Sequence, residues 1–161
     1  MKVVWEIKDK DGKVTKRGEL NQLATKNFLR IMSRIFSADS ITLVNDYGSS
    51  TTFTSVSIGY GSAFVRLGTD TTPPTRDDYN IKGSLIAEGA VGYSRDEVSG
   101  KVTIAFSWTP ASDTLVNEVG LFVRLTGTTT GSYMIDRFLL QQTVPAGQTL
   151  TITWIIDLSA L

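Results

Sequence analysis

The chain has 161 residues, with sixteen basic and sixteen acidic side chains, a formal net charge of zero, and neither cysteine nor histidine. Zero net charge argues against bulk electrostatic capture of nucleic acid or of an anionic membrane. The missing residues remove the usual general base, the thiol nucleophile and the commonest transition-metal ligands. We therefore expect no enzymatic activity, no metal and no cofactor.

The length suits one domain over residues 1–161, which can bury a core without disulfides. Glu6 interrupts the apolar residues near the N-terminus, and no apolar run approaches the roughly 18–20 residues that span a bilayer. We therefore expect a soluble, intracellular chain that does not bind a membrane.

The N-terminal segment predicts a β-hairpin over residues 1–18. Its strands are expected at 3–8 and 14–18, and the pair Asp11-Gly12 between them is a strong hairpin signal.

One helix is expected next, over residues 21–37, because apolar residues recur there at helical spacing. Asn21 is its expected N-cap. Lys26, Arg30 and Arg34 form a basic stripe on the other face, which we interpret as a solvated face. The alternative is a contact with an acidic partner or nucleic acid, to which three charges would contribute little.

The remainder, residues 41–161, predicts an all-β domain, because apolar and polar residues alternate along short segments between turn residues. The pattern favours a jelly-roll-like sandwich or barrel of about 8–10 strands. The strands expected here lie at 41–45, 53–58, 63–67, 84–89, 102–108, 115–125, 132–141 and 150–158.

The loop over residues 67–83 is the most distinctive segment, because a long, proline-stiffened connection between strands is usually functional or packed on something. We expect it to contact a partner; a self-packed crossover loop is an equal alternative. The expected partner or oligomer interface comprises Trp5, Tyr60, Asp70, Pro73, Pro74, Arg76, Asp77, Asp78 and Tyr79.

No catalytic motif is found. The glycines of residues 59–62 (GYGS) lead toward a strand and are interpreted as a turn rather than a phosphate-binding loop. Glycoside hydrolysis would need two facing carboxylates, and the candidates are Glu6, Glu88, Glu97 and Glu118. A calcium site is a further alternative, with ligands from Asp70, Asp77 and Asp78, although their spacing does not match a known calcium loop.

Glu118 lies in an otherwise apolar strand. If its face is buried in a subunit contact, the carboxylate needs a partner, for which Arg124 and Arg137 are the candidates.

Four segments together resemble a family of small virion-associated proteins of tailed phages and other prokaryotic viruses. They are residues 21–29 (NQLATKNFL), 71–79 (TTPPTRDDY), 117–122 (NEVGLF) and 144–154 (VPAGQTLTITW). The resemblance implies a virion structural role as a capsid decoration, minor capsid or tail protein. It also implies that the partners are major capsid or tail proteins, and that the chain forms a homo-oligomer, for which the analogy suggests a trimer. The expected location is the virion, after synthesis in the host cytoplasm. The resemblance implies no catalytic residue.

The alternative is a tail, receptor-binding or carbohydrate-binding β module that stacks a glycan on aromatic side chains. Trp108 and Trp154 alternate with polar residues in strands and are expected in the core. The aromatic candidates that remain are Trp5, Tyr47, Tyr60 and Tyr79.

Overall fold

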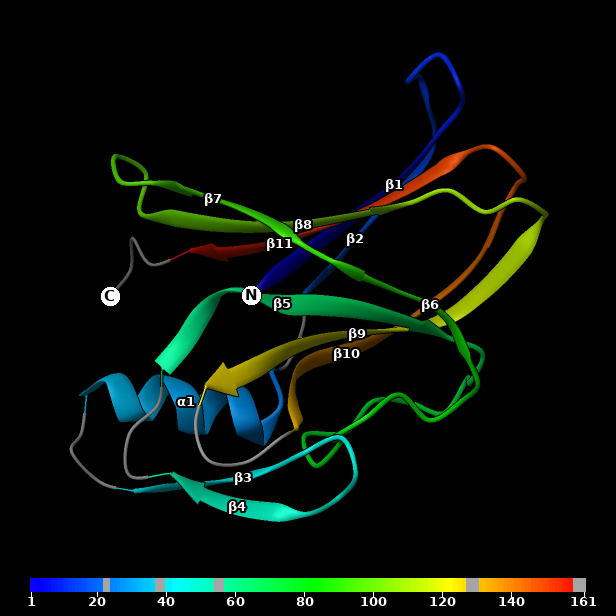
Figure 1. Ribbon diagram of the computed structural model, residues 1–161. Helices are drawn as coiled ribbons and strands as arrows, with labels where there is room; N and C mark the ends of the chain where they lie inside the picture. The colour runs from blue at the N-terminus through cyan, green and yellow to red at the C-terminus, as the bar shows by residue number, and fades with distance from the viewer. Residues whose placement is uncertain (22–23, 37–39, 54–56, 127–130, 158–161) are drawn as a thin grey trace. The chain divides into compact units, whose positions relative to one another are not determined.

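In the residues that the structure describes, the protein is mostly β, with one helix and three antiparallel sheets (Figure 1). The computed structural model describes residues 1–21, 24–36, 40–53, 57–126 and 131–157, and of these it leaves out the side chains of 33–36, 57–62 and 126. The expected all-β class with one helix near the N-terminus is confirmed. Among the described residues, no helix is long and apolar enough to cross a membrane.

The described chain divides into two compact units, and both are discontinuous in sequence. The first comprises residues 1–22, 91–116 and 141–161, and the second comprises 23–90 and 117–140. Two strands, β9 (Thr114–Thr126) and β10 (Ser132–Val144), run from one unit into the other.

The first unit is a five-stranded sheet in the order β2-β1-β11-β8-β7. Its strands are β1 (Lys2–Lys8), β2 (Val14–Asn21), β7 (Gly92–Asp96), β8 (Lys101–Trp108) and β11 (Thr149–Asp157). The register places Val3 opposite Trp154 and Trp154 opposite Ile104, so the apolar residues of alternate positions share one face. Trp154 and Val3 are fully buried, as the alternation predicts.

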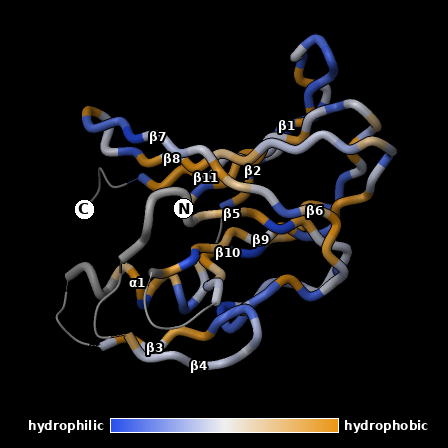
Figure 2. The backbone as a smooth tube through the Cα atoms, in the orientation of Figure 1, coloured by the Kyte–Doolittle hydropathy of each residue, from blue (hydrophilic) through white to orange (hydrophobic). Residues whose placement is uncertain are grey.

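The expected N-terminal hairpin is confirmed as β1 and β2. Asp9 accepts hydrogen bonds from the N–H groups of Asp11 and Lys13, and Gly12 has φ +81°. Only glycine adopts that conformation at no steric cost, so Gly12 fits the turn. Figure 2 shows this turn as hydrophilic, and β5, β9 and β10 as carrying hydrophobic stretches.

The second unit contains a four-stranded sheet in the order β10-β9-β5-β6 and a two-stranded sheet of β3 and β4. Its further elements are α1 (Lys26–Phe36), β3 (Ile41–Val44), β4 (Ser50–Phe53), β5 (Ser57–Gly68) and β6 (Leu85–Ala90). Phe64, Phe122 and Met134 form a buried cluster against which Ile81, from the β5–β6 loop, packs. The loop is therefore attached to the sheet by an apolar contact as well as by polar ones.

The helix begins later than the sequence predicts. Asn21 is not its N-cap, because Asn21 is the last residue of β2 and pairs with Lys2. Thr25 caps α1 instead: its hydroxyl accepts from the N–H of Phe28 at 3.4 Å, and its carbonyl accepts from Leu29. The side chain of Arg34, part of the expected basic stripe, lies outside the described residues.

Three further differences concern strands. Residues 59–62, interpreted as a turn, lie within β5, and the register against β9 shifts between Ile58 and Ala63. Such a shift inserts extra residues into one strand, which local patterns do not reveal. The strand expected at 53–58 is divided between the end of β4 and the start of β5, and residues 54–56 lie outside the described part. Strand β7 was not predicted, because its polar sequence GYSRD does not alternate.

Candidate contact loop and its buried ion pairs

A single buried carboxylate holds both ends of the β5–β6 loop, residues 69–84. Oε1 of Glu118, on β9, accepts hydrogen bonds from the N–H of Asp70 at 3.2 Å and of Gly83 at 2.7 Å. Oε2 accepts from the N–H of Lys82 at 3.0 Å. Because Asp70 and Gly83 each lie one residue inside an end of the loop, Glu118 closes the loop at its base.

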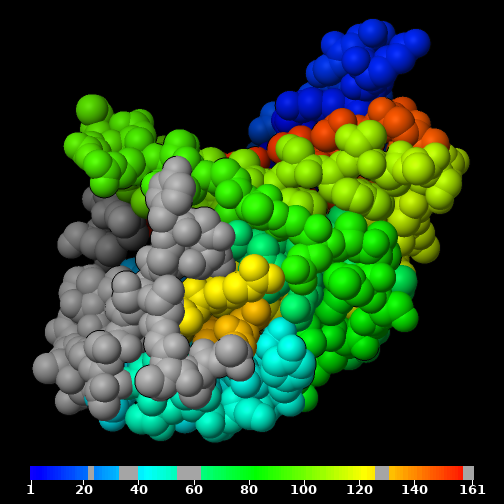
Figure 3. Space-filling model, viewed as in Figure 1, coloured from blue at the N-terminus to red at the C-terminus, as the bar shows by residue number. Residues whose placement is uncertain are grey.

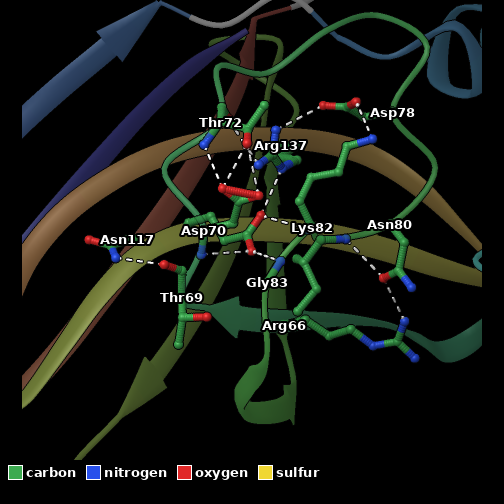
Figure 4. Close-up of polar contacts among 12 residues, drawn as sticks. Arg66, Thr69, Asp70, Thr72, Asp78, Asn80, Lys82, Gly83, Asn117 and Arg137 are labelled. Atoms are coloured by element: carbon green, nitrogen blue, oxygen red, sulfur yellow. Dashed lines mark hydrogen bonds and ion pairs between the residues drawn. The ribbon is translucent and has the colours of Figure 1, made fainter.

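Arg137, on β10, forms an ion pair with Glu118. It also extends the network into the loop, where Figure 4 shows its partners Thr72 and Asp78. Its Nε donates to Oε2 of Glu118 at 2.8 Å, Nη1 donates to Oδ2 of Asp78 at 3.0 Å, and Nη2 donates to the carbonyl of Thr72 at 3.0 Å. The side chains of Arg137 and Glu118 have no exposed surface. A buried guanidinium is tolerable only when it is paired and its donors are satisfied, and each of these three nitrogens has an acceptor.

Asp78 is nearly as buried as Arg137, with a side chain 3% exposed. It accepts from the N–H and the hydroxyl of Thr75, both at 2.9 Å, in addition to Arg137. Burial by itself would raise the pKa of Asp78, but the hydrogen bonds from Thr75 and Arg137 outweigh it and hold the pKa below its ordinary value. Asp78 is therefore ionised at neutral pH and fixes the loop from inside.

A second polar cluster joins the loop to the turn between β3 and β4. Arg66, on β5, donates to Oδ2 of Asp46 at 3.0 Å, to Oδ1 of Asn80 at 3.1 Å and to Oε2 of Glu88 at 2.8 Å. Burial would lower the pKa of Arg66, but the bonds to Glu88 and Asp46 raise it above the ordinary value. The side chain of Asn80 also donates to the backbone carbonyl of Asp46 at 3.0 Å. The loop and the β3–β4 turn are therefore joined by a hydrogen bond to the backbone as well as by ion pairs.

Most of the residues expected at the interface lie in this loop. Pro73, Pro74, Arg76 and Asp77 are exposed, and Tyr79 is 37% exposed. The green atoms of the loop lie at the surface in the space-filling view (Figure 3).

The other expected interface residues have different surroundings. Asp78 is buried, and the carboxylate of Asp70 accepts from the N–H and hydroxyl of Thr72. Trp5 belongs to the first unit, where its ring lies over Gly18 of β2. The side chain of Tyr60 lies outside the described residues.

The partner expected for Glu118 was left open between two arginines, and the structure selects Arg137. Arg124 instead lies 3.4 Å from a carboxylate oxygen of Glu88. Glu118 is buried within its own unit, so no subunit contact is needed to explain the pair. The cluster around Arg66 was not predicted, because its members come from four segments with no shared pattern.

The carboxylates of the two alternative sites each have their own partners in the structure. The four candidate carboxylates each pair with different basic residues: Glu6 with Lys8 and Arg17, Glu88 with Arg66 and Arg124, Glu97 with Arg95, and Glu118 with Arg137. The three candidate calcium ligands also diverge: Asp70 bonds Thr72, Asp77 pairs with Lys26, and Asp78 bonds Thr75 and Arg137. Within the described residues, no cluster of His, Cys, Asp and Glu could hold a metal ion.

Comparison with protein-family models, with curated proteins and with solved structures finds no match. The function must therefore be inferred from the loop, the network beneath it and the surfaces of the two units.

Proposed function

We propose that the chain is a structural protein of a virus particle, a capsid decoration or minor capsid protein that binds the particle surface as an oligomer. The observation that carries the proposal is the rigid β5–β6 loop: a buried Arg–carboxylate network fixes its base and leaves its apex exposed. The proposal includes the jelly-roll-like sandwich expected from the sequence. The resemblance of four segments to virion proteins supports it.

The physical support lies in preorganisation. A loop that is already ordered loses little conformational entropy on binding, so more of its contact energy contributes to affinity. Pro73 and Pro74 stiffen the apex further, and Arg76 and Asp77 supply charge of both signs. Many copies on one particle would add avidity to contacts that are individually weak.

The test uses point substitutions at the apex rather than a deletion. Removing residues 70–79 would take Thr72 and Asp78 from Arg137 and leave a buried charge without acceptors, which would confuse loss of folding with loss of binding. The double variant Arg76→Ala/Asp77→Ala changes exposed side chains and leaves the network intact.

The measurement is the number of chain copies per purified particle, quantified by mass spectrometry on particles assembled with each variant. We expect the apex variant to reduce occupancy about tenfold, which corresponds to about 1.4 kcal/mol. The matched control is Arg95→Ala/Glu97→Ala, an exposed ion pair at the end of β7, with 74% and 75% of the side chains accessible. Equal occupancy of both variants, or absence of the wild-type chain from particles, would contradict the proposal.

A second candidate function, glycan binding, is favoured by one observation. Tyr47, 81% exposed on the β3–β4 turn, directly precedes Gly48, and the Tyr79 ring packs on Gly48. A Cβ at Gly48 would lie 3.3 Å from Cζ of Tyr79. Two tyrosines from distant sequence positions thus border one turn, an arrangement suited to a sugar ring.

An array of mono- and oligosaccharides tests this candidate. We expect bound glycan to be lost in Tyr47→Ala and in Tyr79→Ala, and retained in Tyr93→Ala, which removes an exposed tyrosine of the other unit. No binding by the wild type, or equal binding by all three variants, would eliminate it.

A further inference from the structure

Two exposed prolines of the β5–β6 loop, Pro73 and Pro74, lie between two threonines that the protein holds in place; residues 72–75 are called the proline arch below. On one side, the N–H of Thr72 donates to Oδ1 of Asp70 at 2.7 Å, and the Thr72 hydroxyl donates to the same oxygen at 2.8 Å. The carbonyl of Thr72 accepts from Nη2 of Arg137 at 3.0 Å. The N–H, the hydroxyl and the carbonyl of Thr72 are therefore all engaged within the protein.

Thr75 is held on the other side of the arch in the same way. Its N–H and its hydroxyl each donate to an oxygen of the Asp78 carboxylate, both at 2.9 Å, and its carbonyl accepts from the N–H of Asp78 at 3.3 Å. Arg137 donates to Oδ2 of Asp78 as well as to the carbonyl of Thr72 (Figure 4). One buried guanidinium therefore supports both ends of the proline arch.

The arch presents few kinds of chemical group to solvent. Proline has no N–H and its ring holds φ near about −65°, and a residue that precedes proline, as Thr72 and Pro73 do, is pushed toward the extended or polyproline II conformation. Residues 71–77 are all exposed. In the part of the chain that the structure describes, no hydrogen bond engages the carbonyl of Pro73 or of Pro74. The arch therefore offers two apolar rings and two carbonyl acceptors, without a free donor.

We propose that the partner of this chain recognises the proline arch and receives it in a groove lined by aromatic side chains. Segments in the polyproline II conformation dock in such grooves. The faces of Trp and Tyr rings match the apolar proline rings, and the indole N–H and the phenol O–H can donate to the carbonyls. The inference rests on the proposed function and names the chemistry of the surface that the chain binds.

Other modes of recognition do not fit the arch. Addition of a strand to a sheet needs backbone N–H donors, but the two prolines have none and those of the two threonines are occupied. A contact through the neighbouring carboxylates would have to displace hydrogen bonds, because Asp70 and Asp78 already accept from the threonines.

The support beneath the arch explains how so short a segment can bind. A free peptide loses conformational entropy when it docks in a groove, whereas the arch has already lost that entropy when the chain folds. Arg137 lies beneath the arch and has no exposed surface, so it acts as a positioning residue and does not touch the partner.

Competition with a proline peptide tests the chemistry of the groove. Particles assembled without the chain are mixed with the purified protein, and the bound fraction is measured by co-sedimentation. We expect an excess of a peptide of about ten prolines, which forms polyproline II, to displace most of the bound chain. A glycine–serine peptide of the same length is a flexible coil and should displace little of it.

Substitution of the prolines gives an independent readout in the same assay. Pro73→Ala/Pro74→Ala removes both rings and leaves the partners of the two threonines in place, so we expect binding to weaken about tenfold with an unchanged circular dichroism spectrum. The matched control is Pro145→Ala, which removes a proline from the turn between β10 and β11 and should bind as wild type does.

Several outcomes would overturn the inference. They are displacement by neither peptide, equal displacement by both, and equal binding of the two proline variants. Loss of binding in Arg76→Ala/Asp77→Ala alone would show that the partner recognises charge rather than proline. A wild-type chain that does not bind particles at all contradicts the proposed function and this inference together, whereas a chain that binds equally well without the two prolines contradicts the inference only.

Discussion

The substitution Glu118→Gln separates the buried network from ordinary surface ion pairs. Glutamine keeps one oxygen, which can still accept from the N–H groups of Asp70 and Gly83. Its amide group would face two other donors, the N–H of Lys82 at 3.0 Å and Nε of Arg137 at 2.8 Å. The variant therefore loses two charge-assisted hydrogen bonds and leaves Arg137 with its second carboxylate, Asp78, as the remaining countercharge.

The expected loss follows from those two bonds. Hydrogen bonds to charged groups contribute about 1.5–3 kcal/mol each, and breaking a buried ion pair costs about 3–5 kcal/mol. The two routes agree on about 3–5 kcal/mol, a large part of the roughly 5–15 kcal/mol that stabilises a domain. For a chain of this length, the melting temperature should fall by about 6–20 °C.

Urea denaturation and thermal melting, both followed by circular dichroism, measure the loss. Glu88→Gln is the matched control, because its side chain is 33% exposed and pairs with Arg66 and Arg124. Partly exposed pairs contribute about 0–1 kcal/mol. Trypsin cleavage after Arg76 should also accelerate in Glu118→Gln, since the base of the loop is released. If Glu118→Gln and Glu88→Gln destabilise the protein equally, the buried network does not hold the loop.

Three further predictions concern single positions. Gly18→Ala should cost about 1–3 kcal/mol in urea denaturation, because the new Cβ would lie 2.6 Å from the ring of Trp5, whereas Gly92→Ala, with nothing within 4 Å, should change little. Gln141 has φ +52°, a left-handed conformation that costs residues other than glycine about 1–2 kcal/mol. Gln141→Gly should therefore leave the free energy of unfolding unchanged or raise it slightly, although glycine adds entropy to the unfolded chain. A destabilisation of about 1 kcal/mol or more would show that the backbone at Gln141 is not strained. Asp78 has a folded pKa below its ordinary value of about 3.9, so its contribution to the free energy of unfolding is complete above that pH and is lost as the pH falls through the folded pKa. Asp78→Asn should therefore lower the stability at pH 7 and flatten the fall in stability at acid pH. An unchanged acid limb of the stability curve would show that Asp78 does not stabilise the fold through its charge.

The sequence predicted those features that depend on local pattern. Alternation along 102–108 and 150–158 identified β8 and β11 and the burial of Trp154, because a strand with one buried face imposes a period of two on its own residues. The Asp11-Gly12 pair identified the N-terminal hairpin for a similarly local reason. The sequence predicted the helix but placed its N-cap at Asn21, whereas Thr25 caps it in the structure. Both residue types commonly cap helices, and only the pairing of Asn21 with Lys2 assigns Asn21 to a strand.

The candidate site shows where local pattern ends. Glu118 in an apolar strand indicated by itself that a charged partner was needed, yet Arg124 and Arg137 satisfied that requirement equally. Only the order of strands in the folded sheet brought Arg137 to Glu118 and gave Arg124 to Glu88.

Composition and alternation thus determined by themselves that the chain is a β protein without histidine or cysteine chemistry. Tertiary structure decided which charges pair and which loop is fixed. The physical reason is the distance along the sequence over which each feature is set. The direction of a side chain follows from its neighbours in the same strand, so a local pattern reveals it. An ion pair joins residues far apart in the sequence, which come together only when the sheets have formed.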